Sequence, residues 1–446
     1  MAESIKLPLP SAGCLLCLLS AACLLELFPN LRNLRNLRIS LSECQMISPS
    51  IRTANFHYAI RNLVSAAEAQ EKAGGRIIYL NIGDPQAYGF RPPAHIVEAV
   101  ARALKESFTG YTHSAGLPAA RRAVAAYATS LGSPTAPEQV LLTSGASEAA
   151  DLVLTALVND GDEVLLPAPG YPIYPAILNK LGSIARYYRL VSTRHWQPDI
   201  EEINSLITNR TRALVLINPN NPTGSIIPDA VTKQILELAA RQRLLVIADE
   251  VYRELCFEKQ PTSASVLAQE MDVALITLES LSKTHLVPGW RVGWMRYTHE
   301  KQMRDLTGAI GRLASGRLCS PTPAQYAVEP ALSGSRDFQR DFLRELKSRR
   351  DLCLDRIRKN ESLTCEKPAA AFYLMIKAEM PADRTDERFV IDLLKETGVL
   401  VVPGSGFGVD DHLGYFRMVY LADEGTLGEV FNCIDRFMIH EITRNQ

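Results

Sequence analysis

The sequence has no excess of charge of either sign. Its 446 residues include 48 lysines and arginines and 49 aspartates and glutamates, which gives a formal net charge of -1. A chain with balanced charge has no general attraction to nucleic acid or to an anionic membrane surface, so any anion that it binds must be held locally. We therefore expect a soluble globular protein of two or three domains, with neither a nucleic-acid nor a membrane partner.

Cysteines with pair-like or metal-like spacing are also missing. Four of the nine cysteines fall in the first tenth of the chain and the other five are scattered. Cys14 and Cys17 form a CxxC, but no second pair and no histidine partner accompanies it, which argues against a zinc or redox site. The cysteines indicate reduced thiols in a cytoplasmic protein, and no metal is predicted.

A hydrophobic run long enough to cross a membrane is lacking as well. Residues 13–28 are apolar, but the run is short of the roughly 20 residues that a membrane helix needs, and Glu26 interrupts it. It resembles a signal-peptide core, and the Asn-Leu-Arg repeats at 31–39 resemble a transit peptide. Our preferred interpretation is that residues 1–45 are an atypical extension, disordered or not native, and that Met46 is the true start.

The chain does contain a regular alternation of short apolar runs and helical segments, between residues 93 and 320. The runs are rich in Val, Ile and Leu without polar alternation, which is typical of strands buried on both faces of a mostly parallel sheet between helices. They lie at 140–142, 164–166, 213–217, 244–248 and 274–278. We predict a large α/β domain at 93–320.

The pattern changes beyond about residue 320, where Pro321 and Pro323 interrupt the chain. The elements expected there are a charged helix at 337–359 and strands at 372–376, 399–402 and 415–421. They predict a smaller α+β domain, 321–446, completed by an N-terminal arm and strand from residues 46–92.

Polar or turn-forming residues follow each apolar run, at the strand ends where ligands of such sheets bind. After the first run, Gly145, Ala146 and Ser147 begin a helix, and their amides and hydroxyl suit a phosphate; a plain helix cap is the alternative. After the second run, a proline-rich turn carries Tyr171. Its ring would either stack on a flat cofactor or pack in the core.

The next two runs end in residues suited to a polar ring. Four turn-formers in seven residues follow the third run, which fixes the backbone and leaves Asn221 as a side-chain donor. Asp249 ends the fourth run, where a buried carboxylate is costly unless it is paired. A protonated ring nitrogen would be such a partner, and a helix cap is the alternative. Tyr252 follows, where its phenol would bond a ring oxygen of the same ligand.

The last run is followed by Ser280, Ser282 and Lys283, with Arg291 eight residues beyond the lysine. Most lysines are surface charges, so Lys283 counts as a site residue only together with the other strand ends. The full set offers a phosphate cradle, a stacking ring, donors to a phenolic oxygen, an acid for a pyridinium and a lysine for an imine. Pyridoxal 5'-phosphate (PLP) has all the matching parts, so the combination predicts a PLP site.

From about residue 48 to its end the chain resembles the class I/II aminotransferases of the aspartate aminotransferase fold. The resemblance implies a large sheet of the seven-stranded type, and it makes Lys283 the residue that bonds PLP and shuttles the proton. It assigns Asp249 to the pyridine nitrogen, Tyr252 and Asn221 to the ring oxygen, and Tyr171 to stacking. The resemblance assigns binding of the phosphate to Gly145, Ala146, Ser147, Ser280, Ser282 and Arg291.

Three further residues are implied by the same resemblance. Arg417 matches the arginine that grips the substrate α-carboxylate, with Gly83 and Asn221 assisting, and its planar fork suits a carboxylate. Tyr111 matches the tyrosine that reaches the phosphate in the other subunit. A homodimer with shared active sites is therefore expected.

Two stretches, 81–85 and 288–294, are most similar to the alanine aminotransferase-like branch of the family. One departure is that Ala370 stands where a Pro-x-Gly-Ala-Phe-Tyr pattern has glycine. The backbone near Phe372, and with it the shape of the side-chain pocket, is therefore left open by the sequence.

The resulting prediction is a PLP-dependent aminotransferase with a ping-pong mechanism. A β-lyase or decarboxylase on the same fold and a non-catalytic PLP-binding regulator are the alternatives. Residues 1–45 are too short and too unlike a helix-turn-helix to supply the DNA-binding domain of such a regulator. No second arginine is identifiable for a distal carboxylate, which favours alanine or another small apolar donor, with pyruvate or 2-oxoglutarate as acceptor.

Overall fold

Residues 47–54 and 63–444 are described by the structure, which is a computed structural model. Residues 1–50 and 51–446 form two separate compact units, and of the first only the last four residues, all exposed, are described. The atypical extension predicted at residues 1–45 therefore lies outside the described residues. Among those described, no helix is long and apolar enough to cross a membrane.

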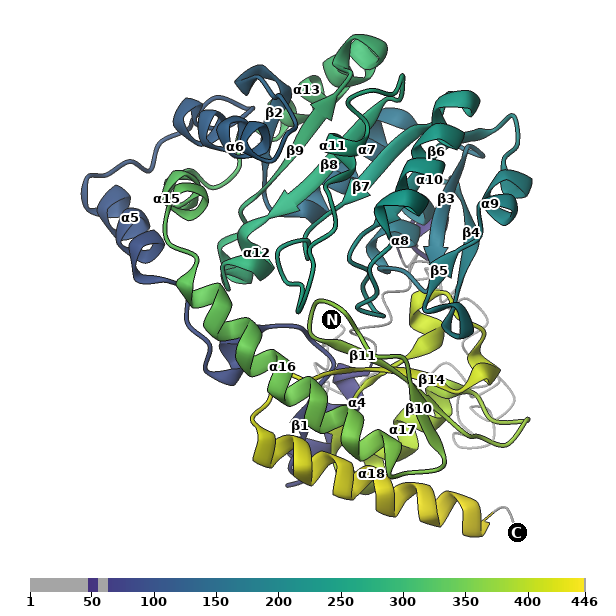
Figure 1. Ribbon diagram of the computed structural model, residues 1–446. Helices are drawn as coiled ribbons and strands as arrows, with labels where there is room; N and C mark the ends of the chain where they lie inside the picture. The colour runs from purple at the N-terminus through teal and green to yellow at the C-terminus, as the bar shows by residue number, and fades with distance from the viewer. Residues whose placement is uncertain (1–46, 55–62, 445–446) are drawn as a thin grey trace, which may run out of the picture. The chain divides into compact units, whose positions relative to one another are not determined.

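The large domain is built on a mixed, mostly parallel sheet (Figure 1). Its strands, in spatial order, are β2 (Val140–Thr143), β9 (Gly293–Thr298), β8 (Leu275–Ser280), β7 (Leu245–Asp249), β6 (Thr211–Ile217), β3 (Glu163–Ala168), β4 (Ile184–Val191) and β5 (Gln197–Pro198). The five strands from β8 to β4 are parallel, while β9 runs against β2 and β8 and β5 runs against β4. The predicted fold is confirmed, with a two-residue edge strand added to seven longer ones.

Alternate residues of the central strands face two separate cores, which explains their continuous apolar runs. In β6, Val215 and Ile217 pack on one side, and Leu214 and Leu216 on the other. The first core is closed by α7 (Ala146–Leu157), α8 (Ile173–Leu181) and α13 (Arg304–Gly316). The second is closed by α9 (Ile200–Leu206), α10 (Asp229–Gln242) and α11 (Ala264–Leu267). With both faces covered, polar side chains gather at the strand ends.

The small domain has an antiparallel sheet in the order β10 (Leu363–Cys365), β11 (Tyr373–Ala378), β14 (Tyr415–Val419) and β13 (Val402–Pro403). A separate parallel pair joins β1 (Ile78–Tyr79) to β12 (Val399–Leu400). The single strand predicted at 399–402 is therefore two, because the chain changes its pairing partner at Val401. The predicted domain boundaries within residues 51–446 stay predictions.

Four helices pack against the small domain, namely α4 (Val64–Lys72), α16 (Asp337–Arg358), α17 (Asp386–Thr397) and α18 (Glu424–Arg444). Figure 1 shows α16 running from the large domain along the side of the small one. The remaining helices are α2 (Ile51–Ala54), α5 (Ala94–Lys105), α6 (Pro118–Ser130), α12 (Leu281–Thr284), α14 (Thr322–Gln325) and α15 (Val328–Ser333).

Candidate active site

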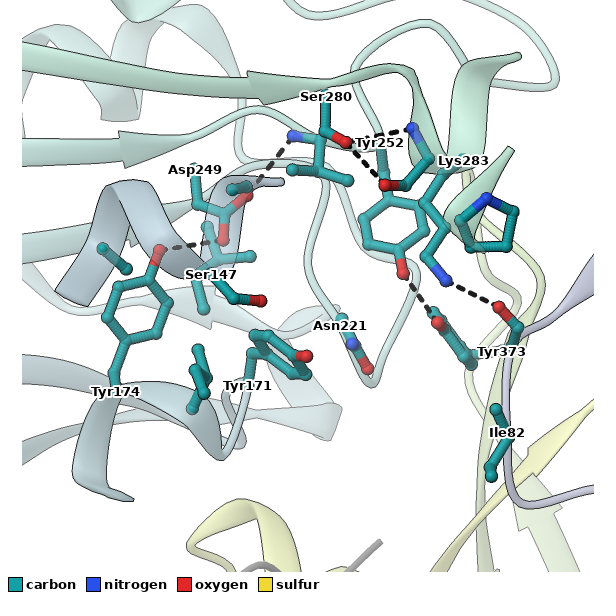
Figure 2. A pocket seen from close by; sticks show the side chains of 18 of the residues that line it. Ile82, Ser147, Tyr171, Tyr174, Asn221, Asp249, Tyr252, Ser280, Lys283 and Tyr373 are labelled. Carbon is teal, nitrogen blue, oxygen red and sulfur yellow. Dashed lines mark hydrogen bonds between the residues drawn. The ribbon is translucent and has the colours of Figure 1, made fainter. Parts of the chain in front are cut away.

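A cavity of about 210 Å³ lies where the carboxyl ends of the large sheet meet the small sheet (Figure 2). Of the fourteen residues predicted for the site, all but Gly145 and Tyr111 line it. These twelve are Gly83, Ala146, Ser147, Tyr171, Asn221, Asp249, Tyr252, Ser280, Ser282, Lys283, Arg291 and Arg417. The structure thus gathers residues from five strand ends, from the N-terminal part of the small domain and from β14.

Lys283 lies on α12, the single helical turn that begins as soon as β8 ends. Its Nζ donates a hydrogen bond to the carbonyl oxygen of Gly83 at 2.6 Å. The pKa of Lys283 is lowered to about 8, chiefly by burial; the charge of Asp84 opposes this change, and the charges of Arg417 and Arg291 add to it. The amine is therefore much closer to its uncharged form at neutral pH than a surface lysine would be.

Asp249 ends β7 and is buried. Its Oδ2 accepts a hydrogen bond from the Tyr174 phenol at 2.8 Å, and its Oδ1 accepts one from the amide of Val251 at 3.3 Å. Burial raises the pKa of Asp249, although both hydrogen bonds oppose the rise. No lysine, arginine or histidine of the described residues forms an ion pair with it, so the carboxyl can take a cationic group from the cavity.

Tyr252 and Tyr373 form a pair of phenols on the opposite wall of the cavity. Their Oη atoms lie 2.6 Å apart, and their rings meet edge to face. Burial, followed by the neighbouring Tyr373 phenol, raises the pKa of Tyr252, which keeps it protonated as a donor. Figure 2 shows this pair on the same side as Lys283, across the cavity from Asp249.

The predicted phosphate residues lie together, with one exception. Ser280 Oγ lies 2.7 Å from Ser282 Oγ, and Arg291 is held by the carbonyl oxygens of Pro288 and Ser144, each at 3.0 Å. The amide of Gly145 donates to the Thr143 carbonyl at 2.8 Å, so it is not offered to the cavity. The first-turn amides of α7, from Ala146 and Ser147, have no carbonyl partner within their helix and take its place.

Gly145 contributes by being small rather than by its amide. It has a φ of 81°, and a Cβ there would lie 2.4 Å from Arg291 Nη2. Any side chain at this position would push the guanidinium out of its place beside the helix start. The glycine therefore allows Arg291 to lie beside the first turn of α7.

Arg417, on β14, is 1% exposed. Its Nη1 donates to Asn221 Oδ1 at 3.2 Å, and its Nη2 donates to the carbonyl oxygen of Asn81. The guanidinium is stacked between two rings, 4.6 Å from the centroid of Tyr373 and 4.8 Å from that of Phe407. These contacts fix the plane of the fork at the cavity.

Comparison with known proteins identifies the family. The sequence profile described as "Aminotransferase class I and II" matches residues 76–434. The chain belongs to the class I and II aminotransferases.

Individual relatives cover nearly the same part of the chain. The alanine aminotransferase of Mycobacterium tuberculosis is 36% identical over 394 residues, which is 86% of this chain and 90% of the relative. The glutamate-pyruvate aminotransferase AlaA of Escherichia coli is 34% identical over 385 residues, 84% of this chain and 94% of the relative. Among solved structures, an alanine aminotransferase from Pyrococcus furiosus superposes with a TM-score of 0.85 at 37% identity, over 88% of this chain and all of the other.

Within this aminotransferase, Tyr111 does not line the cavity of its own chain. Its side chain is 83% exposed on the surface of the large domain. A role in a neighbouring subunit stays a prediction. Ala370, which stands at the usual glycine position of the family, is buried, and it is the next residue, Ala371, that has a positive φ of 60°. The alanine at 370 therefore needs no backbone conformation that favours glycine.

Sequence reasoning missed three residues that shape the aminotransferase site: Tyr174, Tyr373 and Phe407. Tyr174 carried a usable signal, because it lies one helical turn after Tyr171, at the start of α8. The other two come from the small domain, and only the packing of its sheet against the strand ends brings them to the cavity. Among the described residues, no group of three or more His, Cys, Asp or Glu could hold a metal.

Proposed function

We propose that this aminotransferase holds PLP in the cavity and moves the amino group of alanine, or of another small apolar amino acid, to pyruvate or 2-oxoglutarate. The observation that carries the proposal is that Asp249, a buried carboxyl without a cationic partner among the described residues, faces the same cavity as Lys283, a buried amine whose pKa is lowered. Few ligands other than a pyridinium aldehyde need both groups at once.

The other residues present fit the parts of PLP. Asp249 would pair with the ring nitrogen, Tyr252 and Asn221 would bond the ring oxygen, and Tyr171 would cover one face of the ring. The phosphate would be held by Ala146, Ser147, Ser280, Ser282 and Arg291. The phenol and hydroxyl groups in this set support the assignment, because a phosphate and a phenolic oxygen both accept hydrogen bonds.

The bound cofactor supplies an aldehyde that condenses with amines and a protonated ring that withdraws electrons from the substrate Cα. Lys283 would hold the cofactor, and its amine would take and return the proton at Cα as general base. Arg417 holds the α-carboxylate with its fork and so fixes which bond at Cα faces Lys283. Ping-pong order follows, because the first product must leave before a second keto acid can use the same arginine.

A small donor is supported by the charges of the cavity. Its lining contains two arginines, Arg291 and Arg417, and the proposal uses one for the phosphate and the other for the α-carboxylate. No third arginine lines the cavity within the described residues. The names of the alanine and glutamate-pyruvate aminotransferases among the relatives point the same way.

The proposal includes a homodimer with shared active sites in the cytoplasm. Tyr111 supports the dimer, because a large aromatic side chain left 83% exposed is available to a second copy of the chain. Its phenol would reach the partner's phosphate site.

The test is a screen of amino donors against pyruvate and 2-oxoglutarate, with the PLP absorbance followed in the same samples. Wild-type protein is expected to bind PLP and to transfer the amino group of alanine, while Lys283→Ala loses both the lysine-bound absorbance band and turnover. A Lys283→Ala variant with normal activity would refute the assignment. Release of ammonia or carbon dioxide without amino transfer would favour a lyase or decarboxylase, and PLP binding without any turnover would favour a regulator.

A further inference from the structure

A second layer of buried charged side chains lies directly behind the wall of the cavity. Three of its members are sequence neighbours of cavity residues: Glu250 of Asp249, Arg253 of Tyr252, and Glu279 of Ser280. Each of the three is no more than 6% exposed. The side chains of Glu250, Arg253 and Glu279 are absent from the lining of the cavity, although their sequence neighbours are part of it.

Arg253 is the cation that joins the two carboxylates. Its Nε lies 3.2 Å from Glu250 Oε2, and its Nη2 lies 3.8 Å from Glu279 Oε1. The other oxygen of each carboxylate is engaged elsewhere. Glu250 Oε1 accepts from the amide of Ala264 at 2.7 Å, and Glu279 Oε2 forms an ion pair with Arg296 at 2.7 Å.

The bridge lies where the backbone pairing of two strands has ended. The parallel register of β7 and β8 runs to Asp249 and Leu278, and the amide of Glu250 donates to the carbonyl oxygen of Leu278 at 3.0 Å. Beyond that point the paired register of β7 with β8 stops. The contact between Arg253 and Glu279 therefore connects the two segments that follow the paired parts of β7 and β8. These segments carry Tyr252 and Ser280 to the cavity.

The charges of this layer balance. Glu250 and Glu279 carry two negative charges and Arg253 and Arg296 carry two positive ones, all buried. Removing one member leaves a net charge that the interior cannot solvate. Outside these four, Arg253 donates to the phenol of Tyr127 at 2.5 Å.

The outer edge of the layer reaches the helix that joins the domains. Tyr127 donates to Glu254, which accepts from Arg336 at 3.0 Å and from Gln339 at 2.9 Å. Gln339 also donates to the carbonyl oxygen of Thr284 at 2.8 Å, one residue after Lys283. Through Tyr127, Glu254 and Gln339 the layer is thus linked to the backbone of the helical turn that carries Lys283.

We propose that Arg253 is a positioning residue, which sets the spacing between Tyr252 and Ser280 by bridging Glu250 and Glu279 behind them. The inference rests on the proposed function, because Tyr252 and Ser280 would hold the ring oxygen and the phosphate of one PLP molecule. Two contacts at opposite ends of a rigid ligand bind it well only when their separation is fixed. Arg253 touches neither PLP nor substrate.

The experiment compares Arg253→Met with the double variant Arg253→Met/Glu250→Gln. The single variant leaves one uncompensated negative charge, whereas the double variant is neutral again and keeps the Glu279 to Arg296 pair. We expect the single variant to lose stability and to bind PLP at least about tenfold more weakly. The double variant should recover stability while PLP binding stays about tenfold weaker, because the bridge is still missing.

The measurements are the dissociation constant of PLP, from absorbance titration of the full chain stripped of cofactor, and the urea unfolding midpoint. Arg253→Lys keeps the charge and is expected to restore PLP binding to within about threefold, since a lysine still attracts both carboxylates. Arg189→Met is the matched control, because Arg189 pairs with Glu202 at 2.7 Å on the surface. It should change neither quantity.

Recovery of PLP binding in step with stability in the double variant would overturn the proposal, since Arg253 would then only balance charge. The double variant and Arg253→Lys decide the question even if Arg253→Met does not fold. If the wild-type protein fails to bind PLP, the proposed function itself is overturned. If the wild type and all variants bind PLP equally well, only the positioning role of Arg253 is overturned. The kinetic signature expected for the double variant is a lower kcat with the KM for alanine within about threefold, because Arg417 is untouched.

Discussion

The phenol of Tyr174 donates a hydrogen bond to the carboxylate of Asp249, with 2.8 Å between Tyr174 Oη and Asp249 Oδ2. Both side chains are buried, and burial raises the pKa of each. A protonated phenol beside a buried carboxyl favours the ionised form of that carboxyl. Tyr174 thus opposes the effect of burial and favours the ionised form of Asp249, the form that would pair with a protonated ring nitrogen.

We expect Tyr174→Phe to weaken PLP binding by about three- to tenfold, because one hydrogen bond of roughly 1 kcal/mol to the carboxylate is lost. Absorbance titration of the cofactor-free variant measures the change. Tyr188→Phe is the matched control, since the Tyr188 phenol is equally buried but bonds the carbonyl oxygen of Val215 at 2.8 Å, away from the site. Equal PLP affinity in all three proteins would contradict the role given to Tyr174.

The lowered pKa of Lys283 predicts a pH dependence for the uptake of PLP by the cofactor-free protein. Only the uncharged amine attacks an aldehyde, and the pKa of about 8 replaces the usual value of 10.5. The uptake rate should therefore rise with pH up to about pH 8 and level off above it. Stopped-flow absorbance from pH 6 to 10 measures it, and a rate still climbing steeply at pH 10 would show that burial does not tune this lysine.

Substitution of Arg417 separates carboxylate binding from cofactor binding. Arg417→Lys replaces a planar fork with a point charge and removes the stacking on Tyr373 and Phe407. We expect the KM for alanine to rise about ten- to a hundredfold, which corresponds to roughly 1.4–2.8 kcal/mol. PLP affinity should stay within about twofold. Steady-state kinetics and PLP titration on the same preparation test both statements, and an unchanged KM would remove Arg417 from the substrate site.

Glu163 lies at the start of β3, far from the cavity. We expect it to make the stability of the protein sensitive to acid. Its side chain is fully buried and is held by Arg186, Arg210 and Thr208. Burial alone would raise its pKa, but these three partners outweigh burial and lower the pKa of Glu163 from 4.5 to about 2. The stability that Glu163 contributes is therefore complete above about pH 4.5 and is lost as the pH falls toward 2.

The corresponding variant is Glu163→Gln. It should lower the free energy of unfolding at pH 7 by about 1–2 kcal/mol, allowing for the partly exposed arginines. The difference from wild type should shrink by pH 3. Urea unfolding at both pH values measures this, with Glu202→Gln, which removes the surface pair to Arg189, as the control. A difference that is the same at pH 7 and pH 3 would contradict the assigned pKa.

The sequence predicted the central strands and their ends because burial on both faces imposes an apolar run with a polar terminus. It did not predict β4, which carries two arginines, is largely exposed or partly exposed and lies beside the two-residue β5, nor β9, which carries Arg296. A buried arginine such as Arg296 is acceptable in a strand only when an acidic partner lies within reach, here Glu279 on the neighbouring strand, and a single sequence does not show that pairing.

The same limit applied to the site. The site residues that directly follow each predicted strand were predicted from the local sequence pattern alone. Tyr373 reaches the cavity, and Phe407 reaches Arg417 in its wall, only through the packing of the small domain, a long-range arrangement that no local motif encodes. Gly145 was predicted as an amide donor, whereas the structure uses its missing side chain to admit Arg291.

The distribution of site residues along the chain also bears on synthesis. Lys283 hydrogen-bonds Gly83, which precedes the large sheet in sequence, and Arg417, the proposed carboxylate ligand, lies on β14, after the last strand of that sheet. A nascent chain on the ribosome can therefore complete its large sheet and still lack a substrate site. The cavity takes residues from segments before and after the large sheet, so a chain cut before β14 is expected to lack transaminase activity.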